Sequence, residues 1–271
     1  MSDEQRNRLG GMALANGLLV HGRTHWAAAV RDADGRTIVA SGRKPQLARG
    51  PLAEIPLLRG VLRLAEAMAV VPAARTAVPE ARLALEGRGV LAATAGSAAL
   101  TALARRRIPS VLGQEAVAAG AGLLPALIAL RASDAAVWHG VEHKSIAAYE
   151  RGGAPEVAHN ADHAKEHDRC GSNLVLPLLL TTVIGNTVLR KLMPRPTIAA
   201  RLALSAACVG ISVEAFAFAG RRPDHPVSRV IHRVGHALQS GFATKEPNEE
   251  DLAVGRAAMD ELLRAEGAAG E

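Results

Sequence analysis

Residues 171–189 read GSNLVLPLLLTTVIGNTVL, a run without a charged side chain. A helix needs about 20 apolar residues to cross the hydrocarbon core of a bilayer, so this run is long enough for one crossing. The stretch 202–220, with Glu214 as its one charged residue, fits the same requirement. Two further stretches, 89–104 and 110–130, are marginal. We therefore predict a mainly α-helical integral membrane protein with about four apolar helices; buried helices of a soluble protein are the alternative.

The composition agrees with close helix packing in lipid. Hydrophobic residues make up 49% of the 271 residues but aromatic residues only 2%, so the apolar mass is mostly Ala, Leu and Val. The net charge of +6 comes from scattered arginines without interleaved aromatic residues or a nucleic-acid-binding motif. We expect no nucleic-acid partner, and we expect the lipid bilayer as the chain's surroundings. The two cysteines predict no disulfide framework, and the polar N-terminus is not a signal peptide.

The polar parts flank and interrupt the apolar helices. Residues 1–88 are predicted to hold a β hairpin, because Asp34-Gly35 separates two apolar runs, followed by an amphipathic helix within 51–88. Residues 89–220 form the predicted membrane domain, with a polar insert at 132–173, and residues 221–271 form a polar tail. Four crossings would place all three polar parts on one side. We predict the cytoplasmic side of the cell membrane, although the connecting loops are basic as well and the positive-inside rule therefore does not fix the orientation.

The insert begins with an H-x-x-E-H motif formed by His139, Glu142 and His143. Residues four apart lie one above the other on a helix, so both imidazoles can reach one ion. The intervening glutamate then lies beside that face as a general base, as in inverted zinc-hydrolase motifs. The alternative is a solvated polar helix without a metal.

The following segment supplies further ligands. His159, His163 and His167 recur every four residues, and Cys170 follows. Catalytic zinc takes three protein ligands drawn from His, Cys and carboxylate, so His167 and Cys170 are candidates, whereas the first two histidines can be spare. Glu150 lies on the same helical face as the motif and is predicted to orient a ligand.

Glu214 is unusual because a carboxylate inside an apolar span costs about 2.5–3.5 kcal/mol on insertion scales. One interpretation is an ion pair with Arg221 or Arg222 near the interface. The other, which we favour, places Glu214 under the metal site as a distant ligand or as an acceptor for one.

These motifs, in this order, resemble the bacterial family called domain of unknown function 1385, multi-span membrane proteins described as metal-dependent enzymes. The likeness covers about residues 10–262, with Asn16 standing where the family usually has an acidic residue. The matching blocks are GGMALANGLLVHG and PLLRG near the front, HGVEHKSIAAYERG and HDRCGSN in the insert, and ISVEAF and TKEPNEEDLAVG later. The resemblance implicates His139, Glu142, His143, Glu150, His167, Arg169, Cys170, Glu214 and Glu246.

The sequence thus predicts a membrane enzyme that depends on a divalent metal, zinc by preference, and hydrolyses a substrate at the bilayer surface. His139 and His143, with one or both of His167 and Cys170, would hold the ion. Glu142 would act as the base, and Arg169, implicated by the resemblance, would stabilise an anion. A site at the bilayer surface suggests a lipid-linked or membrane-protein substrate. The alternative is a non-enzymatic scaffold or transport protein in which a fully coordinated metal holds the insert in place.

Overall fold

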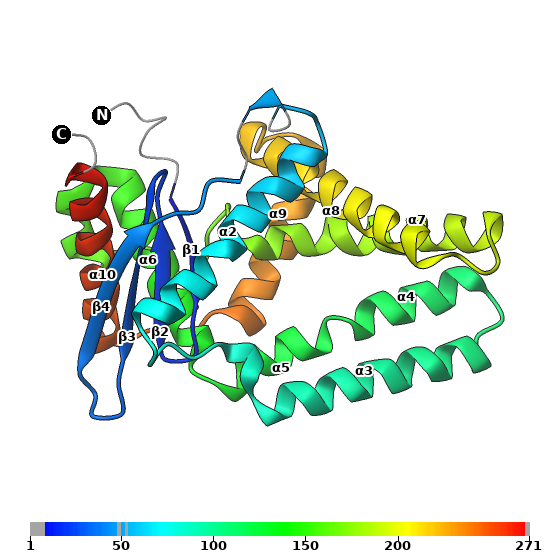
Figure 1. Cartoon of the computed structure of the whole chain (residues 1–271), viewed down its shortest axis with the longest axis horizontal. Coiled ribbons are helices and arrows are strands. Elements are labelled where there is room, and N and C mark those ends of the chain that lie inside the picture. Colours follow the sequence, from blue (N-terminus) through cyan, green and yellow to red (C-terminus); the bar gives the residue numbers. More distant parts are fainter. Residues whose placement is uncertain (1–8, 48–49, 52–53, 269–271) are drawn as a thin grey trace.

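The computed structural model describes residues 9–47, 50–51 and 54–268, and it is mainly helical with one small antiparallel sheet near the N-terminus (Figure 1). The strands form a meander in the order β1-β2-β3-β4. The predicted hairpin is confirmed, because Asp34 and Gly35 lie in the turn between β3 and β4, where Gly35 adopts a positive φ of 79°. The sheet extends beyond that hairpin to four strands: β1 (Gly10–Ala13), β2 (Gly17–His21), β3 (His25–Arg31) and β4 (Thr37–Arg43).

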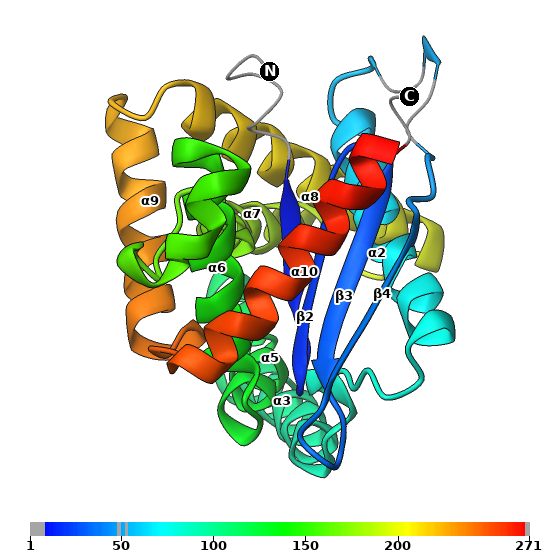
Figure 2. The same cartoon turned by 90° about the vertical axis from the view of Figure 1, so that its left-hand side faces the viewer.

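Both faces of the sheet are covered by helices. Leu18 and Val20 of β2 point toward α6 (Ala135–Gly152) and α10 (Glu249–Ala268), and Leu19 points to the opposite face, toward α2 (Leu58–Ala77). In Figure 2, α10 crosses in front of the strands and α2 lies behind them. This double coverage explains why β2 and β3 are almost uniformly apolar, since both sides of each strand enter a core.

The helix α10 comes from the segment predicted to be a polar tail. Its apolar face joins the core of the sheet domain through Val254, Ala258, Met259 and Leu262, which are buried. The two ends of the described chain therefore pack together, on one side of the apolar helices (Figure 1).

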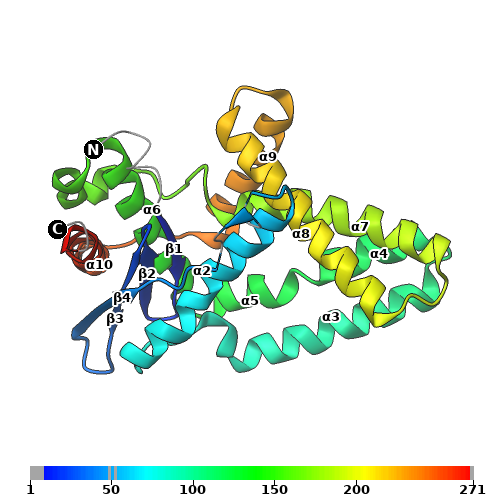
Figure 3. The same cartoon turned by 45° about the horizontal axis from the view of Figure 1, so that its top comes forward.

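The remaining long helices extend away from the sheet as two antiparallel hairpins (Figures 1 and 3). One hairpin pairs α3 with the broken helix α4–α5, and the other pairs α7 with α8. Loops around residues 108–110 and 193–197 close the hairpins at the end far from the sheet. The bounds are α3 (Arg88–Arg107), α4 (Val111–Ala121), α5 (Leu124–Ala132), α7 (Val175–Leu192) and α8 (Ile198–Arg221).

Three segments of the described chain are long and apolar enough to cross a membrane: Val111–Arg131, Gly171–Leu192 and Ile198–Arg221. Little of them is buried inside the protein, between 11% and 22% of each apolar window. Large apolar side chains such as Ile184, Leu202 and Leu112 are exposed on them. The sequence predicted about four such helices; α3, the fourth, is not among these three segments.

Shorter elements connect the two parts. The helix α9 (Pro226–Leu238) and the π-helical turn η5 (Gln239–Ala243) follow α8 and lead back toward α10. The insert between α6 and α7 folds as the short helices η3 (Ala154–Asp162) and η4 (Gly171–Leu174), and the short helix η2 (Ala84–Glu86) precedes α3.

Candidate metal centre

The H-x-x-E-H motif lies on α6, as predicted, and this helix is buried on two sides. Trp138, Val141 and Tyr149 pack into the core that α6 shares with the sheet and α10. Gly140 lets the loop after η5 approach closely, since a Cβ there would lie 2.3 Å from the backbone oxygen of Lys245. Packing on these sides turns His139, Glu142 and His143 toward a pocket of about 160 Å³.

The insert is held against α6 by buried polar contacts. The ammonium group of Lys144 donates to the backbone oxygens of Ala161 (3.0 Å) and His163 (2.7 Å). The side chain of Asn160 donates to the Ser145 hydroxyl at 3.0 Å and to the Leu252 backbone oxygen at 3.2 Å. Because Lys144 and Asn160 are both buried, these bonds fix the path of the insert past the motif.

A fully buried glutamine positions the end of the insert. The Gln239 side chain accepts from the backbone N–H of His167 at 2.7 Å. Its amide nitrogen donates to the His167 carbonyl at 3.2 Å and to the Ser172 hydroxyl at 2.7 Å. Gln239 thereby holds both ends of the turn that carries Cys170.

His139, His143 and Cys170 converge in this pocket. One possible ligand atom from each lies within 4.8 Å of the other two. The Nε2 atom of His139 is 3.3 Å from the Cys170 Sγ. The bond lengths of tetrahedral zinc, ~2.0–2.1 Å to nitrogen and ~2.3 Å to sulfur, put neighbouring ligand atoms ~3.4–3.7 Å apart. The separation of His139 and Cys170 is therefore close to that of two zinc ligands, and the three side chains could hold one ion.

The hydrogen bonds of the two imidazoles support this assignment. The Nδ1 atom of His139 bonds the Ala243 carbonyl at 2.9 Å, and that of His143 bonds the Lys165 carbonyl at 2.5 Å. A carbonyl oxygen can only accept, so each Nδ1 carries a proton and Nε2 is the nitrogen that remains available to a metal. Metal-binding histidines are oriented in this way by an outer hydrogen bond. The donor set of two imidazoles and a thiol fits zinc.

Burial shifts the pKa values of His143 and Cys170. It lowers the pKa of His143 to about 2, with the nearby His139 acting in the same direction, so the imidazole stays neutral as a ligand must. Burial likewise raises the pKa of the Cys170 thiol. A cation in the pocket would offset that effect and favour the thiolate.

Glu142 is buried beside the two histidines. Its Oε2 atom lies 3.9 Å from the Nε2 of His139. Burial raises the pKa of Glu142 to about 7, and this effect outweighs the favourable field of His139. A carboxyl group with such a pKa can both accept and release a proton near neutral pH.

His167, Glu150 and Arg169 form a second group at the edge of the pocket. The Nδ1 atom of His167 accepts from the Arg169 backbone N–H at 3.1 Å, so its Nε2 carries a proton and donates to Glu150 at 3.1 Å. Glu150 also forms an ion pair with the Arg169 guanidinium. His167 and Arg169 line the pocket, but His167 does not belong to the three-residue ligand group. Its predicted ligand role, like that of Arg169 as an anion stabiliser, stays a prediction.

The other predicted site residues lie farther out. Glu246 pairs with Lys144 at 2.7 Å and is mostly exposed. Glu214 forms a bidentate pair with Arg59 of α2, with distances of 2.6 and 2.5 Å, and not with Arg221 or Arg222 as in the alternative interpretation. It is not among the residues that line the pocket, so the favoured role under the metal site stays a prediction. The histidines considered spare differ from each other, since His159 is exposed whereas His163 is buried with its Nε2 3.5 Å from Glu156.

The first two strands also contribute to the pocket, which sequence reasoning did not predict. A Cβ on Gly11 would lie 2.6 Å from the Cγ and Oε1 atoms of Glu142, so the β1 backbone runs directly over that carboxyl. His21 of β2 lines the same pocket, and burial together with Lys44 lowers the pKa of His21 to about 4. The signal in the sequence was the Gly10-Gly11 pair, because adjacent glycines in a strand mark a close approach of the backbone.

Comparison with known proteins covers the part of the chain that carries the candidate ligands. The family model described as "Protein of unknown function (DUF1385)" matches residues 134–265. A curated protein, "Uncharacterized protein YqhQ" of Bacillus subtilis (strain 168), is 32% identical over 132 residues, which span 48% of this chain and 40% of that protein. No solved structure matches. The predicted family resemblance is thus confirmed from α6 to α10, whereas the blocks in residues 10–60 lie outside the family match.

Proposed function

We propose that this chain, whose residues 134–265 belong to the family of unknown function 1385, is a zinc-dependent hydrolase embedded in the cell membrane. The observation that carries the proposal is the convergence of His139, His143 and Cys170 beside a buried carboxyl group, Glu142. Three protein ligands leave a fourth position of a tetrahedral ion for water or substrate, which is typical of catalytic zinc.

The proposed chemistry divides between the ion and the chain. A bound zinc ion would supply a Lewis acid that makes water nucleophilic near neutral pH and polarises the substrate. Glu142 would take up the proton of the attacking water and return it to the leaving group, a role that suits its raised pKa. Arg169, at the rim of the pocket and paired with Glu150, would stabilise negative charge that develops on the substrate.

An apolar pocket beside the candidate centre favours an amphiphilic, lipid-linked substrate over a purely polar one. This pocket of about 250 Å³ shares His139 and Gly171 with the polar pocket. Its other walls are mostly apolar side chains, including Leu127 of α5, Val175 of α7 and Phe242 of η5. A substrate could place its reacting group at the ligands and its apolar tail between these helices.

The two hairpins support four crossings of the bilayer. Three crossings would leave the chain ends on opposite sides, but both described ends lie with the sheet (Figure 1). The helix α3 runs back along α4 and α5 and ends in Arg105, Arg106 and Arg107, which lower its mean hydropathy. We propose that α3 is the fourth crossing and that the sheet domain and the pocket lie at the cytoplasmic surface.

Glu142→Gln tests the reaction separately from metal binding. The substitution keeps the size of the side chain and leaves all three proposed ligands in place. We expect the purified variant to retain the parent's zinc content, while its ability to restore a strain lacking the gene falls by the ~10²–10⁴-fold that general-base catalysis is worth. Glu250→Gln is the matched control, because Glu250 is exposed on α10.

The alternative, a metal-stabilised scaffold or transport protein, predicts another pattern. The ligands would matter for assembly, but Glu142→Gln would restore the strain as well as the parent does. That result would overturn the hydrolase proposal while leaving the metal site intact. Loss of zinc from Glu142→Gln would instead make Glu142 a ligand or a necessary support of one.

A further inference from the structure

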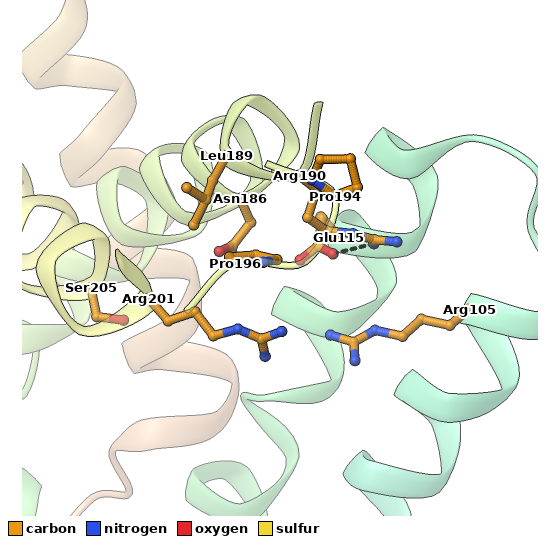
Figure 4. Close-up of a pocket in the computed structure, with 9 residues that line it drawn as sticks. All are labelled: Arg105, Glu115, Asn186, Leu189, Arg190, Pro194, Pro196, Arg201 and Ser205. Atoms are coloured by element: carbon orange, nitrogen blue, oxygen red, sulfur yellow. Dashed lines mark hydrogen bonds and ion pairs between the residues drawn. The ribbon is translucent and has the colours of Figure 1, made fainter. Parts of the chain in front are cut away.

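A second polar pocket lies at the opposite end of the hairpins from the candidate metal centre. It has a volume of about 380 Å³ and lies between the ends of α3, α4, α7 and α8 (Figure 4). Since the loops that close both hairpins meet here, this end would lie at the far surface of the bilayer if the helices cross it. The lining residues are Arg105, Glu115, Asn186, Leu189, Arg190, Pro194, Pro196, Arg201 and Ser205.

One of the three arginines is neutralised within the protein. Arg190 donates from Nη1 to the carboxylate of Glu115 at 2.7 Å and to the side-chain oxygen of Gln114 at 2.8 Å. Glu115 and Gln114 are both buried. The Glu115 carboxylate is thereby neutralised, and Arg190 is held in place as part of the pocket wall.

Arg105 and Arg201 have no such partner among the described residues. Their side chains extend from α3 and α8, and in Figure 4 the two guanidinium groups point toward each other across the pocket. The pocket therefore carries two uncompensated positive charges that repel each other. A bound anion would remove this repulsion.

The neighbouring groups suit a phosphate. A guanidinium group presents paired N–H donors that match two phosphate oxygens, and the Asn186 amide and Ser205 hydroxyl add donors to the lining. At the level of the bilayer surface, a phosphate group is available from lipid headgroups as well as from solution. We propose that Arg105 and Arg201 bind a phosphate group here, supplied by an anionic phospholipid or by free phosphate. The site is remote from the candidate metal centre, so this proposal does not rest on the proposed reaction.

Ligand-induced stabilisation tests the site in the full-length protein purified in detergent. The melting temperature is measured with increasing phosphatidylglycerol, with zwitterionic phosphatidylcholine, and with inorganic phosphate. We expect phosphatidylglycerol to stabilise the parent and phosphatidylcholine not to do so. The double variant Arg105→Gln/Arg201→Gln should weaken the apparent affinity about tenfold or more, because charge-assisted hydrogen bonds are lost.

The matched control is Arg106→Gln/Arg107→Gln, which removes the same number of charges, both from the end of α3 that also carries Arg105, but from residues that do not line the pocket. Stabilisation by inorganic phosphate with the same arginine dependence would identify free phosphate as the source; stabilisation by phosphatidylglycerol alone would identify the lipid. Equal weakening by both double variants would show diffuse surface charge and would overturn the proposal, as would a parent that responds to none of the anions. The single variant Arg201→Gln provides the same comparison if the double variant does not fold.

Discussion

The Nε2 atom of His139 lies 3.3 Å from the Sγ atom of Cys170, although 31 residues separate them in the chain. Each partner is fixed independently of a metal. The ring of His139 is held by its bond to the Ala243 carbonyl, and the turn that carries Cys170 is held by Gln239. Because these supports come from η5, the segment after α9 organises a site whose candidate ligands all lie before α7. A preorganised site of this kind would lose little conformational freedom when it binds an ion.

We expect the three proposed ligands to be individually necessary for metal binding. His139→Ala, His143→Ala and Cys170→Ala each remove one donor atom that Ala cannot replace. Loss of an outer partner already costs ~10–100-fold in metal affinity, so loss of a ligand should cost more and leave the purified variant without stoichiometric zinc. Elemental analysis of the parent and the variants measures the effect.

His159→Ala is the control for this series, because His159 lies in the same insert but is exposed. It should keep the zinc content of the parent. Unchanged zinc content in His143→Ala or in Cys170→Ala would contradict the assigned ligand set. His167→Ala then decides whether His167 binds the ion, since loss of zinc there would add a ligand to the group.

Gly11→Ala tests the contact between β1 and Glu142. The added Cβ would lie 2.6 Å from the Glu142 carboxyl oxygen, closer than the atoms can approach, so the carboxyl must move. We expect zinc content to be retained but activity in complementation to fall, up to ~10²-fold for a displacement near 1 Å. Gly96→Ala is a suitable comparison, because no atom lies within 4 Å of its added Cβ. Full activity of Gly11→Ala would show that β1 does not position the Glu142 carboxyl group.

Local patterns in the sequence were sufficient to predict several elements of the structure. The spacing of His139 and His143 depends only on the helical repeat, and the hairpin at Gly35 depends on a single turn with positive φ. The apolar stretches are likewise readable from composition over a short window. These features need no knowledge of distant contacts. The structure contains the motif helix, the hairpin and three of the four apolar stretches as candidate membrane spans.

Features that depend on long-range packing could not be predicted in the same way. Gln239 reaches His167 across 72 positions, and Glu214 reaches Arg59 across 155. Nothing in the neighbourhood of either residue indicates its partner. The apolar face of α10 could not be recognised in the sequence because the helix has many charged residues. Met259 and Leu262 on that face are nevertheless fully buried in the core next to the sheet.

His21 should make the stability of the protein depend on pH. Its pKa is lowered from 6.5 to about 4 by burial and by Lys44. Between these values the unfolded chain binds more protons than the folded protein, so the free energy of unfolding falls as pH falls from 6.5 toward 4. A shift of this size corresponds to at most ~3 kcal/mol.

Melting temperatures of the parent and of His21→Asn, measured between pH 4 and pH 7, test this dependence. Asn preserves an acceptor near the Lys44 ammonium group, which lies 3.2 Å from the His21 Nδ1 atom. The pKa of His143 is lowered as well, but His143 is present in both proteins. The difference between the two curves of melting temperature against pH therefore isolates the effect of His21. Parallel curves would show that His21 is solvated instead of buried in its neutral form.

The Arg59–Glu214 pair should couple the sheet domain to the apolar helices. Arg59 belongs to α2, which covers one face of the sheet, and Glu214 belongs to α8. The helices are in close contact here, since a Cβ on Gly60 would lie 2.8 Å from the Val213 side chain. The bidentate geometry satisfies both charges at the same time.

A double-mutant cycle measures this coupling. Arg59→Gln or Glu214→Gln leaves one charge without its partner and should lower the melting temperature in detergent by roughly 2–4 °C. Removing both should lower it by less than the sum of the single effects, because no uncompensated charge remains. Arg63→Gln, on the exposed side of the same helix, should have almost no effect. Strictly additive single effects would mean that Glu214 is tolerated in its apolar helix for a reason other than Arg59, and the predicted role under the metal site would then be the next to test.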